Sequence, residues 1–333
     1  AHVGIKMKVT AIPSLDGIRA ISVFIVLFSH AGLGHVIPGG FGVTTFFFLS
    51  GYLITTLLLV EYQNNGQINF RYFFARRFLR LFPPLLITLF ISYMMVSIGV
   101  LGGGLSWIGS LSQIFYLANY HIIFHWPGSI PEGTGILWSL AVEEHFYLLF
   151  PFLFYILIHK YGQRNTAAVL FLICMMVLVW RCGLVFYYQV EPIRTYYATD
   201  TRIDSILYGC IMAMVWNPGF KEATEKMRWQ EYILLLVSIM LLLLSFLYRD
   251  EQFRETFRYT LQGIALIPLF YLAIRYPENR LFRFLNYWWM KKLGVYSYFI
   301  YLSHFIVIHA LKDNDVVETI PLLIILSSAI CIT

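Results

Sequence analysis

The sequence predicts an all-α fold: a polytopic helical membrane protein with about ten transmembrane helices and one re-entrant or interfacial segment. Of its 333 residues, 59% are hydrophobic and only 13% are charged, whereas soluble domains carry about 25% charged residues. Apolar stretches long enough to cross a bilayer, which needs about 20 residues each, recur from Ile18 to the end of the chain. No water-soluble domain of useful size remains between them.

The apolar stretches give the following candidate spans in chain order. We expect them at residues 17–34, 41–62, 83–101, 136–159, 165–188, 203–217, 230–248, 257–275, 293–311 and 319–333, with an ambiguous segment at 106–120. Residues 70–82 interleave arginines with aromatic residues and precede Pro83-Pro84. This pattern predicts an amphipathic helix that lies at the membrane interface before the third span.

Lysines and arginines in the short loops predict the orientation, because cytoplasmic loops are rich in both. Lys6 and Lys8 place the N-terminus in the cytoplasm, and the arginines of residues 71–80 place the second loop there. The net charge of +6 is spread over such loops. It therefore indicates topology and anchoring to membrane lipids, and no nucleic-acid partner is expected.

The alternation of spans bears on segment 106–120. Two later basic loops, 221–228 and 275–292, reach the cytoplasm only if this segment does not cross the membrane. We therefore expect it to enter and return or to lie at the surface. The loop from 249 to 258, which mixes arginines with acids, then lies outside.

We expect residues 1–333 to form a single transmembrane domain with a truncated C-terminus, because the chain ends at Thr333 inside an apolar run. The first apolar run lacks a small-residue cleavage motif, so we expect a membrane span that is kept and not a signal peptide that is cleaved off. The four cysteines lie in apolar segments without metal-site spacing. We expect no metal and no permanently bound cofactor.

Two polar residues of the first span lie at different depths on one helical face. Arg19 and His30 are eleven residues apart, which gives a net rotation of about 20° and a rise of about 16 Å. Asp16 lies one turn before Arg19. A charge at mid-membrane costs at least about 2.5–3.5 kcal/mol, so such a group needs a partner or a function. A snorkelling arginine and a packed histidine are the plainer alternative.

A later span carries two acids inside an apolar helix. Ser139, Glu143 and Tyr147 are four residues apart and form a polar stripe on one face. Glu144 lies beside this stripe. These groups could satisfy one another and fix helix packing. Glu143, which lies on the stripe, is the stronger catalytic candidate.

Other polar groups recur in later spans. Asp200 and Asp204 lie one turn apart with Arg202 between them, where helix capping or ion pairing is at least as good an explanation as a functional role. Tyr301 and His304 share one face of a late span, and His304 taken alone is most simply structural.

Three arginines cluster near the second loop. Arg76, Arg77 and Arg80 could anchor the chain to anionic lipid. They could also bind a phosphate-bearing ligand, because guanidinium groups bind phosphates through two parallel hydrogen bonds.

Taken together, these residues resemble the acyltransferase-3 membrane enzymes, which O-acetylate cell-surface glycans, and the resemblance covers essentially the whole chain. It rests on residues 16–20 (DGIRA), the Arg19 and His30 pair, residues 40–43 (GFGV), residues 47–52 (FFLSGY), Arg77-x-x-Arg80, Trp138-Ser139 with Glu143-Glu144, and Ser297-Tyr298 with His304.

The resemblance implies an enzyme of the bacterial cytoplasmic (inner) membrane. Its donor substrate would be cytoplasmic acetyl-CoA. Its acceptor would be a glycan hydroxyl across the membrane, in O-antigen, peptidoglycan or exopolysaccharide. The family's Arg-x10-His pair maps onto Arg19 and His30, and its R-x-x-R motif onto Arg77 and Arg80.

These roles combine into a catalytic hypothesis. The phosphates of coenzyme A bind at the arginine cluster of residues 76–80. The acyl thioester then reaches His30, which acts as general base or becomes acylated. Glu143 orients the imidazole or stabilises its protonated form, and Arg19 is the third residue of the predicted catalytic set. A secondary transporter or glycan flippase, with the buried His and Glu as a proton relay, is the alternative from another class. A second alternative is another class of membrane acyltransferase, one that uses lipid-linked or longer acyl donors.

Overall fold

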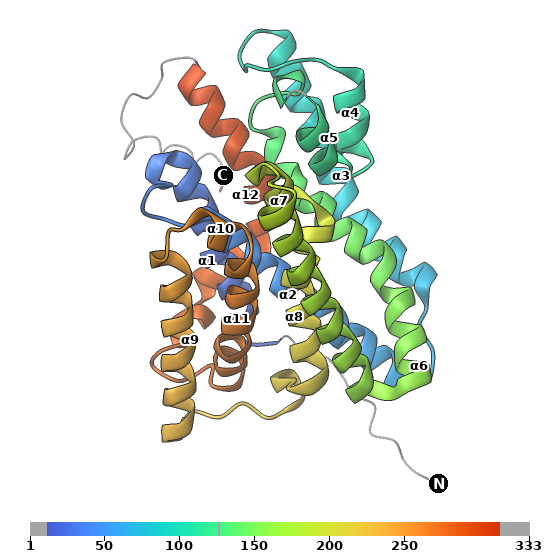
Figure 1. The fold of residues 1–333 in the computed structure, drawn as a ribbon, viewed down its shortest axis with the longest axis vertical. Helices are drawn as coiled ribbons and strands as arrows, with labels where there is room; N and C mark the ends of the chain where they lie inside the picture. Colours follow the sequence, from blue (N-terminus) through green and yellow to red (C-terminus); the bar gives the residue numbers. More distant parts are fainter. Residues whose placement is uncertain (1–11, 126, 314–333) are drawn as a thin grey trace.

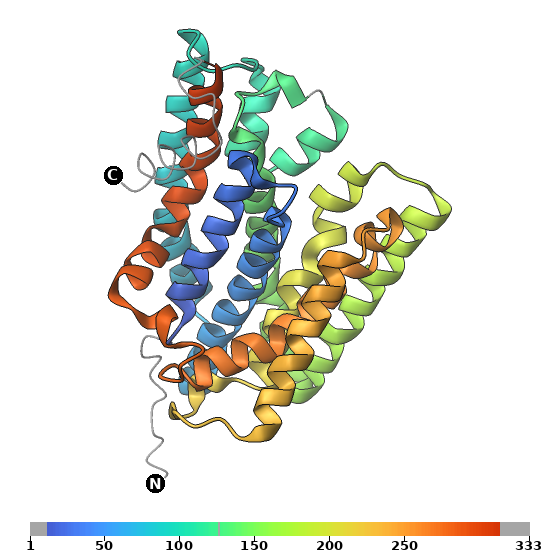
Figure 2. The ribbon, with the colours of Figure 1, turned by 90° about the vertical axis from the view of Figure 1, so that its left-hand side faces the viewer.

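The computed structural model describes residues 12–125 and 127–313. The described chain is a bundle of long helices (Figures 1 and 2), and its only strand-like pairing is an isolated bridge between Gly103 and Pro131. The predicted fold class, an all-α polytopic membrane protein, is confirmed.

The helices have the following bounds. They are α1 (Leu15–Phe28), α2 (Gly39–Asn65), α3 (Phe70–Ser97), α4 (Trp107–Ile114), α5 (Ala118–Phe124), α6 (Leu137–Cys182), α7 (Pro192–Tyr197), α8 (Thr199–Val215), α9 (Trp229–Leu247), α10 (Glu251–Glu255), α11 (Phe257–Arg275) and α12 (Trp288–Asp313). π-Helical turns extend α1 through Ser29–Leu33 and α6 through Gly183–Tyr187, and 3-10 turns lie at Pro127–Ser129, Thr134–Ile136, Pro218–Phe220 and Arg283–Asn286.

The number of membrane crossings agrees with the prediction only in outline. Among the described residues, seven helical stretches are long and apolar enough to cross a membrane. The longest, Thr134–Tyr187, has 54 residues and folds back at Gly162 (φ 73°), so that its two halves run in opposite directions (Figure 1). The helix α8 has 17 residues. The predicted count of ten is not confirmed, and the span expected at 319–333 lies outside the described residues.

The bundle has one basic end. The start of α1 and the start of α3 lie at this end, together with the loops that follow α8 and α11 (Figure 1). Segment 106–120 forms the short helices α4 and α5, which lie together at the opposite end (Figure 1). This arrangement matches the prediction that the segment does not cross the bundle.

The separate interfacial helix predicted for residues 70–82 is wrong. The helix α3 runs without interruption through Pro83 and Pro84. Proline removes an amide donor and usually kinks or ends a helix. Here α3 packs along α12, and the hydroxyl of Tyr298 donates to the carbonyl of Leu81 just before the prolines (2.9 Å). Tertiary contacts therefore outweigh the local preference.

Glycines bring the central helices close together. A side chain at Gly51 of α2 would overlap the backbone carbonyl of Ile206 in α8, and one at Gly209 of α8 would overlap the carbonyl of Phe48. Gly294 lies in the same way against the backbone at Asp16, where α12 meets α1. Small residues let membrane helices approach closely. Figure 2 shows α1, α2 and α12 side by side as a result.

We expect Gly51→Ala and Gly209→Ala each to destabilise the protein by about 1–3 kcal/mol, the usual cost of overpacking. Thermal unfolding of the detergent-solubilised protein measures this. Gly183→Ala is the matched control, because a side chain there meets no atom within 4 Å. Equal stability of the Gly51 and Gly183 variants would contradict the close packing of α2 on α8.

Candidate active site

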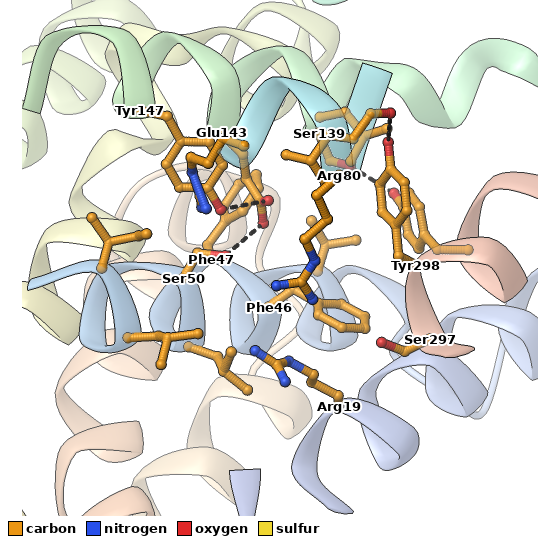
Figure 3. A pocket seen from close by; sticks show the side chains of 18 residues that line it. Arg19, Phe46, Phe47, Ser50, Arg80, Ser139, Glu143, Tyr147, Ser297 and Tyr298 are labelled. Carbon is orange, nitrogen blue, oxygen red and sulfur yellow. Dashed lines mark hydrogen bonds between the residues drawn. The ribbon is translucent and has the colours of Figure 1, made fainter. Parts of the chain in front are cut away.

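A pocket opens between α1, α2, α3, α6 and α12 (Figure 3). It holds about 800 Å³ of space, part of which is open to the surroundings. Its polar lining consists of Arg19, Ser50, Arg77, Arg80, Ser139, Glu143, Tyr147, Ser297, Tyr298 and Tyr301. Ligand pockets combine apolar walls with a few such polar groups. The pocket is therefore the leading candidate for a binding site.

Three arginines converge on this pocket. Arg19 and Arg80 point toward each other across it (Figure 3). The guanidinium of Arg77 lies over the ring of Tyr147, 3.3 Å from its centroid. Arg19 also forms an ion pair with Asp16, one turn earlier (2.5 Å). Residues from α1 and α3 thus bring three arginines to one pocket.

Arg76 does not belong to this group. Its guanidinium lies over the exposed ring of Tyr72, 4.2 Å from the centroid, and Arg76 does not line the pocket. The reason is helical geometry, because consecutive residues point about 100° apart. The predicted place of Arg76 in the donor site is therefore not supported by the structure.

The polar stripe on α6 faces the pocket. Ser139, Glu143 and Tyr147 all line it, which confirms that they share one face. The carboxylate of Glu143 accepts hydrogen bonds from Ser50 (3.2 Å) and from Tyr147 (3.0 Å). Glu144, the next residue along the helix, does not line the pocket. Glu143 is thus held by α2 and by its own helix.

His30 is paired with a second histidine. The Nδ1 atom of His30 lies 2.8 Å from Nε2 of His304, and the two rings are stacked with their centroids 5.1 Å apart. Phe305 covers the ring of His30, with the ring centroids 4.2 Å apart. The residue that bonds to His30 is thus His304 of α12, whereas Glu143 bonds to Ser50 and Tyr147.

The contacts of His304 define the tautomers of both rings. Its Nδ1 lies 2.7 Å from the carbonyl oxygen of Tyr301 and 3.2 Å from that of Ile300. Carbonyl oxygens only accept, so this Nδ1 carries the proton. In neutral His304 the Nε2 then accepts from Nδ1–H of His30. Neutral His30 is left with an unprotonated Nε2, which is the form that a general base needs.

Tyr301 links the pocket to the histidine pair. Its hydroxyl lies 2.7 Å from the hydroxyl of Ser139 at the pocket wall. Its ring centroid lies 5.6 Å from that of His304. Tyr301 and His304 share a face of α12, as their spacing predicted. Polar groups thus follow α1 and α12 from the arginines of the pocket, through Ser139 and Tyr301, to His304 and His30. We call this series of groups the polar path, with the arginines at one level and His30 at the other.

The acids of α8 form ion pairs away from the pocket. Asp204 pairs with Arg181 at 2.8 Å, and both side chains are fully buried. Arg181 also donates to the hydroxyl of Thr260 (2.6 Å). Asp200 pairs with Arg194 at 2.6 Å. The ion-pair interpretation is confirmed for both acids, and neither lines the pocket.

Arg202 is buried among aromatic rings. Its guanidinium lies 4.1 Å from the ring centroid of Tyr259 and 5.5 Å from that of Trp138. It donates to the carbonyl of Tyr196 (3.2 Å) and to the hydroxyl of Thr44 (3.1 Å). Cation–π contacts of this kind can stabilise a desolvated cation. Arg202 supports the wall behind the pocket and does not line it.

Sequence reasoning did not single out Ser50 and Tyr298 as site residues. Both line the pocket, and Ser50 binds the catalytic candidate Glu143. Ser50 could have been found as a polar residue inside an apolar span. The His30 and His304 contact joins residues 274 positions apart, and no local pattern reports such a distance. Within 12–125 and 127–313, no group of three His, Cys, Asp or Glu side chains could hold a metal ion.

Comparisons with known proteins point to one family. A family model described as an acyltransferase domain matches residues 12–333. The O-acetyltransferase OatA of Staphylococcus aureus is 31% identical over 322 residues, which cover 93% of this chain and 53% of that protein. The peptidoglycan O-acetyltransferase OatA of Listeria monocytogenes is 30% identical over 309 residues, covering 89% and 49%. The chain thus spans about half the length of these curated relatives. No solved structure matches it.

The buried Arg181 and Asp204 pair yields a stability prediction. Arg181→Met should cost about 3–5 kcal/mol, because it leaves a buried carboxylate without its partner. Adding Asp204→Leu should restore most of that loss. Arg194→Met is the control, since it breaks a partly exposed pair worth about 0–1 kcal/mol. Thermal unfolding in detergent measures all three. A double variant no more stable than Arg181→Met would show that the pair is not the cause.

Proposed function

Because this chain belongs to the acyltransferase family, we propose that it is a membrane O-acyltransferase that moves an acetyl group from acetyl-CoA to a hydroxyl of a cell-surface carbohydrate. One observation carries the proposal. A single pocket has arginines at one level, and at the other level its wall includes Tyr301, which packs against His304 of the histidine pair. The relatives' names support a glycan acceptor, with peptidoglycan ahead of O-antigen or exopolysaccharide. The same family membership counts against the transporter alternative.

The donor enters at the basic end of the bundle. Basic loops mark the cytoplasmic side of membrane proteins, which supports a cytoplasmic N-terminus in the bacterial inner membrane. Arg19, Arg77 and Arg80 bind the phosphates of coenzyme A, because guanidinium groups form paired, charge-assisted hydrogen bonds with phosphate oxygens. The pantetheine arm then extends along the pocket toward Ser139 and Tyr301.

The transfer needs a base at the far level, and His30 supplies it. Its Nε2 accepts the proton of the acceptor hydroxyl while that oxygen attacks the thioester carbonyl carbon. The tetrahedral intermediate collapses, the carbon–sulfur bond breaks, and the leaving thiolate takes the proton back from the imidazolium. The products are the O-acetylated carbohydrate and free coenzyme A, and no redox step is involved.

His304 acts as a positioning residue. It accepts Nδ1–H of His30 and is itself held by the carbonyl of Tyr301. When His30 takes up a proton at Nε2, the bond to His304 remains intact, so the pair need not rearrange during the reaction. A fixed tautomer and ring orientation serve the same purpose in other histidine bases.

The hydroxyls of Tyr301 and Ser139 are the best placed groups to stabilise the oxyanion. They lie 2.7 Å apart at the pocket wall nearest the histidine pair. Ser139 also lies 3.2 Å from the carbonyl of Ile136, which fixes its position. Donors that are already in place cost no reorganisation when negative charge develops on the carbonyl oxygen.

We expect His30→Ala to lower kcat about 10²–10⁴-fold, the usual contribution of a general base, with acetyl-CoA binding unchanged. His304→Leu should lower kcat with little effect on either KM. His304→Gln should recover part of the rate, since its amide oxygen can accept Nδ1–H of His30. The assay follows labelled acetyl transfer by purified protein in lipid nanodiscs.

The pH profile separates positioning from a merely structural role of His304. The Leu variant should shift the pH dependence of kcat, and the Gln variant should return it toward the wild type. A His30→Ala protein that folds, binds acetyl-CoA and acetylates at the wild-type rate would refute the catalytic assignment.

Arg77→Ala and Arg80→Ala should each raise the apparent KM for acetyl-CoA about tenfold or more, the value of a charge-assisted hydrogen bond. Neither should change the KM for acetyl-pantetheine, which lacks the nucleotide phosphates. Arg76→Ala is the matched control, because Arg76 lies outside the pocket. Unchanged values for acetyl-CoA in both variants would contradict the donor site.

A further inference from the structure

A second cavity lies at the opposite end of the bundle from the basic loops. It is formed by the loop between α1 and α2, by α7, and by the turn that carries α10 between α9 and α11 (Figure 1). It holds about 1430 Å³ of space, part of it open to the surroundings. The donor pocket has no lining residue in common with this cavity.

The cavity carries an excess of positive charge. Arg249, Arg254, Arg258 and Glu255 line it. Arg258 forms an ion pair with Glu255, with 3.7 Å between the nearest N and O atoms. Within the part of the chain that the structure describes, no ion pair joins Arg249 or Arg254 to an acid, and both are exposed. Two guanidinium groups therefore remain available to a negatively charged ligand.

The walls of the cavity suit a sugar ring. The rings of Phe41, Tyr196 and Tyr259 line it, and Gln262 contributes a nearly buried amide. A side chain at Gly40 would come within 2.9 Å of the hydroxyl of Tyr196, so glycine lets this ring lie close against the loop between α1 and α2. Aromatic faces combined with a few fixed polar groups give a pocket both affinity and orientation.

The cavity adjoins the histidine pair. Ser29 lines it and directly precedes His30 in the same π-helical turn. Tyr196, on another wall, packs against Trp138 with ring centroids 5.0 Å apart. Trp138 in turn precedes Ser139, which bonds to Tyr301. A ligand in the cavity would thus lie close to His30 and Tyr301, where we propose that acyl transfer takes place.

We propose that this cavity binds an acidic saccharide, with its carboxylate between Arg249 and Arg254, and that it is the acceptor site of the transfer. The inference rests on the proposed function. Anionic lipid headgroups could pair with the same arginines. The aromatic rings and the amide inside the cavity favour a saccharide, because a headgroup anchor needs only exposed cations.

The test measures binding without acetyl-CoA. The full chain in nanodiscs of zwitterionic lipid is titrated with two probes, cellobiouronic acid and cellobiose, which differ by one carboxylate. We expect the acid to bind about tenfold more tightly. The double variant Arg249→Gln/Arg254→Gln should abolish this preference. Arg164→Gln/Arg280→Gln is the matched control, since it removes two exposed arginines elsewhere in the protein and should keep the preference.

Two results would overturn the proposal: equal affinity for both probes, or a preference that survives in the double variant. Displacement of the acid by anionic lipid added to the nanodiscs, with lipid binding lost in the double variant, would assign the cavity to headgroups. The proposed function fails separately if the wild-type protein in nanodiscs transfers no acetyl group from acetyl-CoA to any carbohydrate.

Discussion

A polar side chain inside a membrane-spanning bundle must find its partner within the protein, because lipid offers neither hydrogen bonds nor charge screening. This constraint explains where the polar groups of this chain lie. Asp204 binds Arg181, and His30 binds His304, each across two helices. Arg77 and Arg80 differ, because they face a space that a ligand can enter. Pairing thus separates the groups that hold the bundle together from those that remain available for chemistry.

Close helix packing turns these pairs into a site. Glycines let α12 lie against α1 and let α8 lie against α2, so that residues from distant parts of the sequence line one pocket. The path along α1 and α12 then has two levels, with arginines at one and the histidine pair at the other. Under the proposed function, their separation of about 16 Å along the helix matches a donor with a long flexible arm.

Much of the fold followed from composition and periodicity, because long apolar runs have few alternatives to helices in a membrane. The polar stripe on α6 and the shared face of Tyr301 and His304 depend only on residue spacing within one helix, and both are confirmed. What could not be predicted depends on contacts between distant helices. The partner of His30, the partner of Arg181 and the continuity of α3 through Pro83 are all of this kind.

In the proposed reaction, one donor molecule reaches from the arginines of the pocket to the histidine pair. The most direct measurement is a structure of the full chain in a nanodisc with a non-hydrolysable acetyl-CoA analogue. We expect the phosphates to contact Arg77 and Arg80, and the acyl group to lie beyond Ser139, next to His30. Phosphates bound at Arg249 and Arg254, or an acyl group that stays at the level of Arg19, would contradict the proposed reaction.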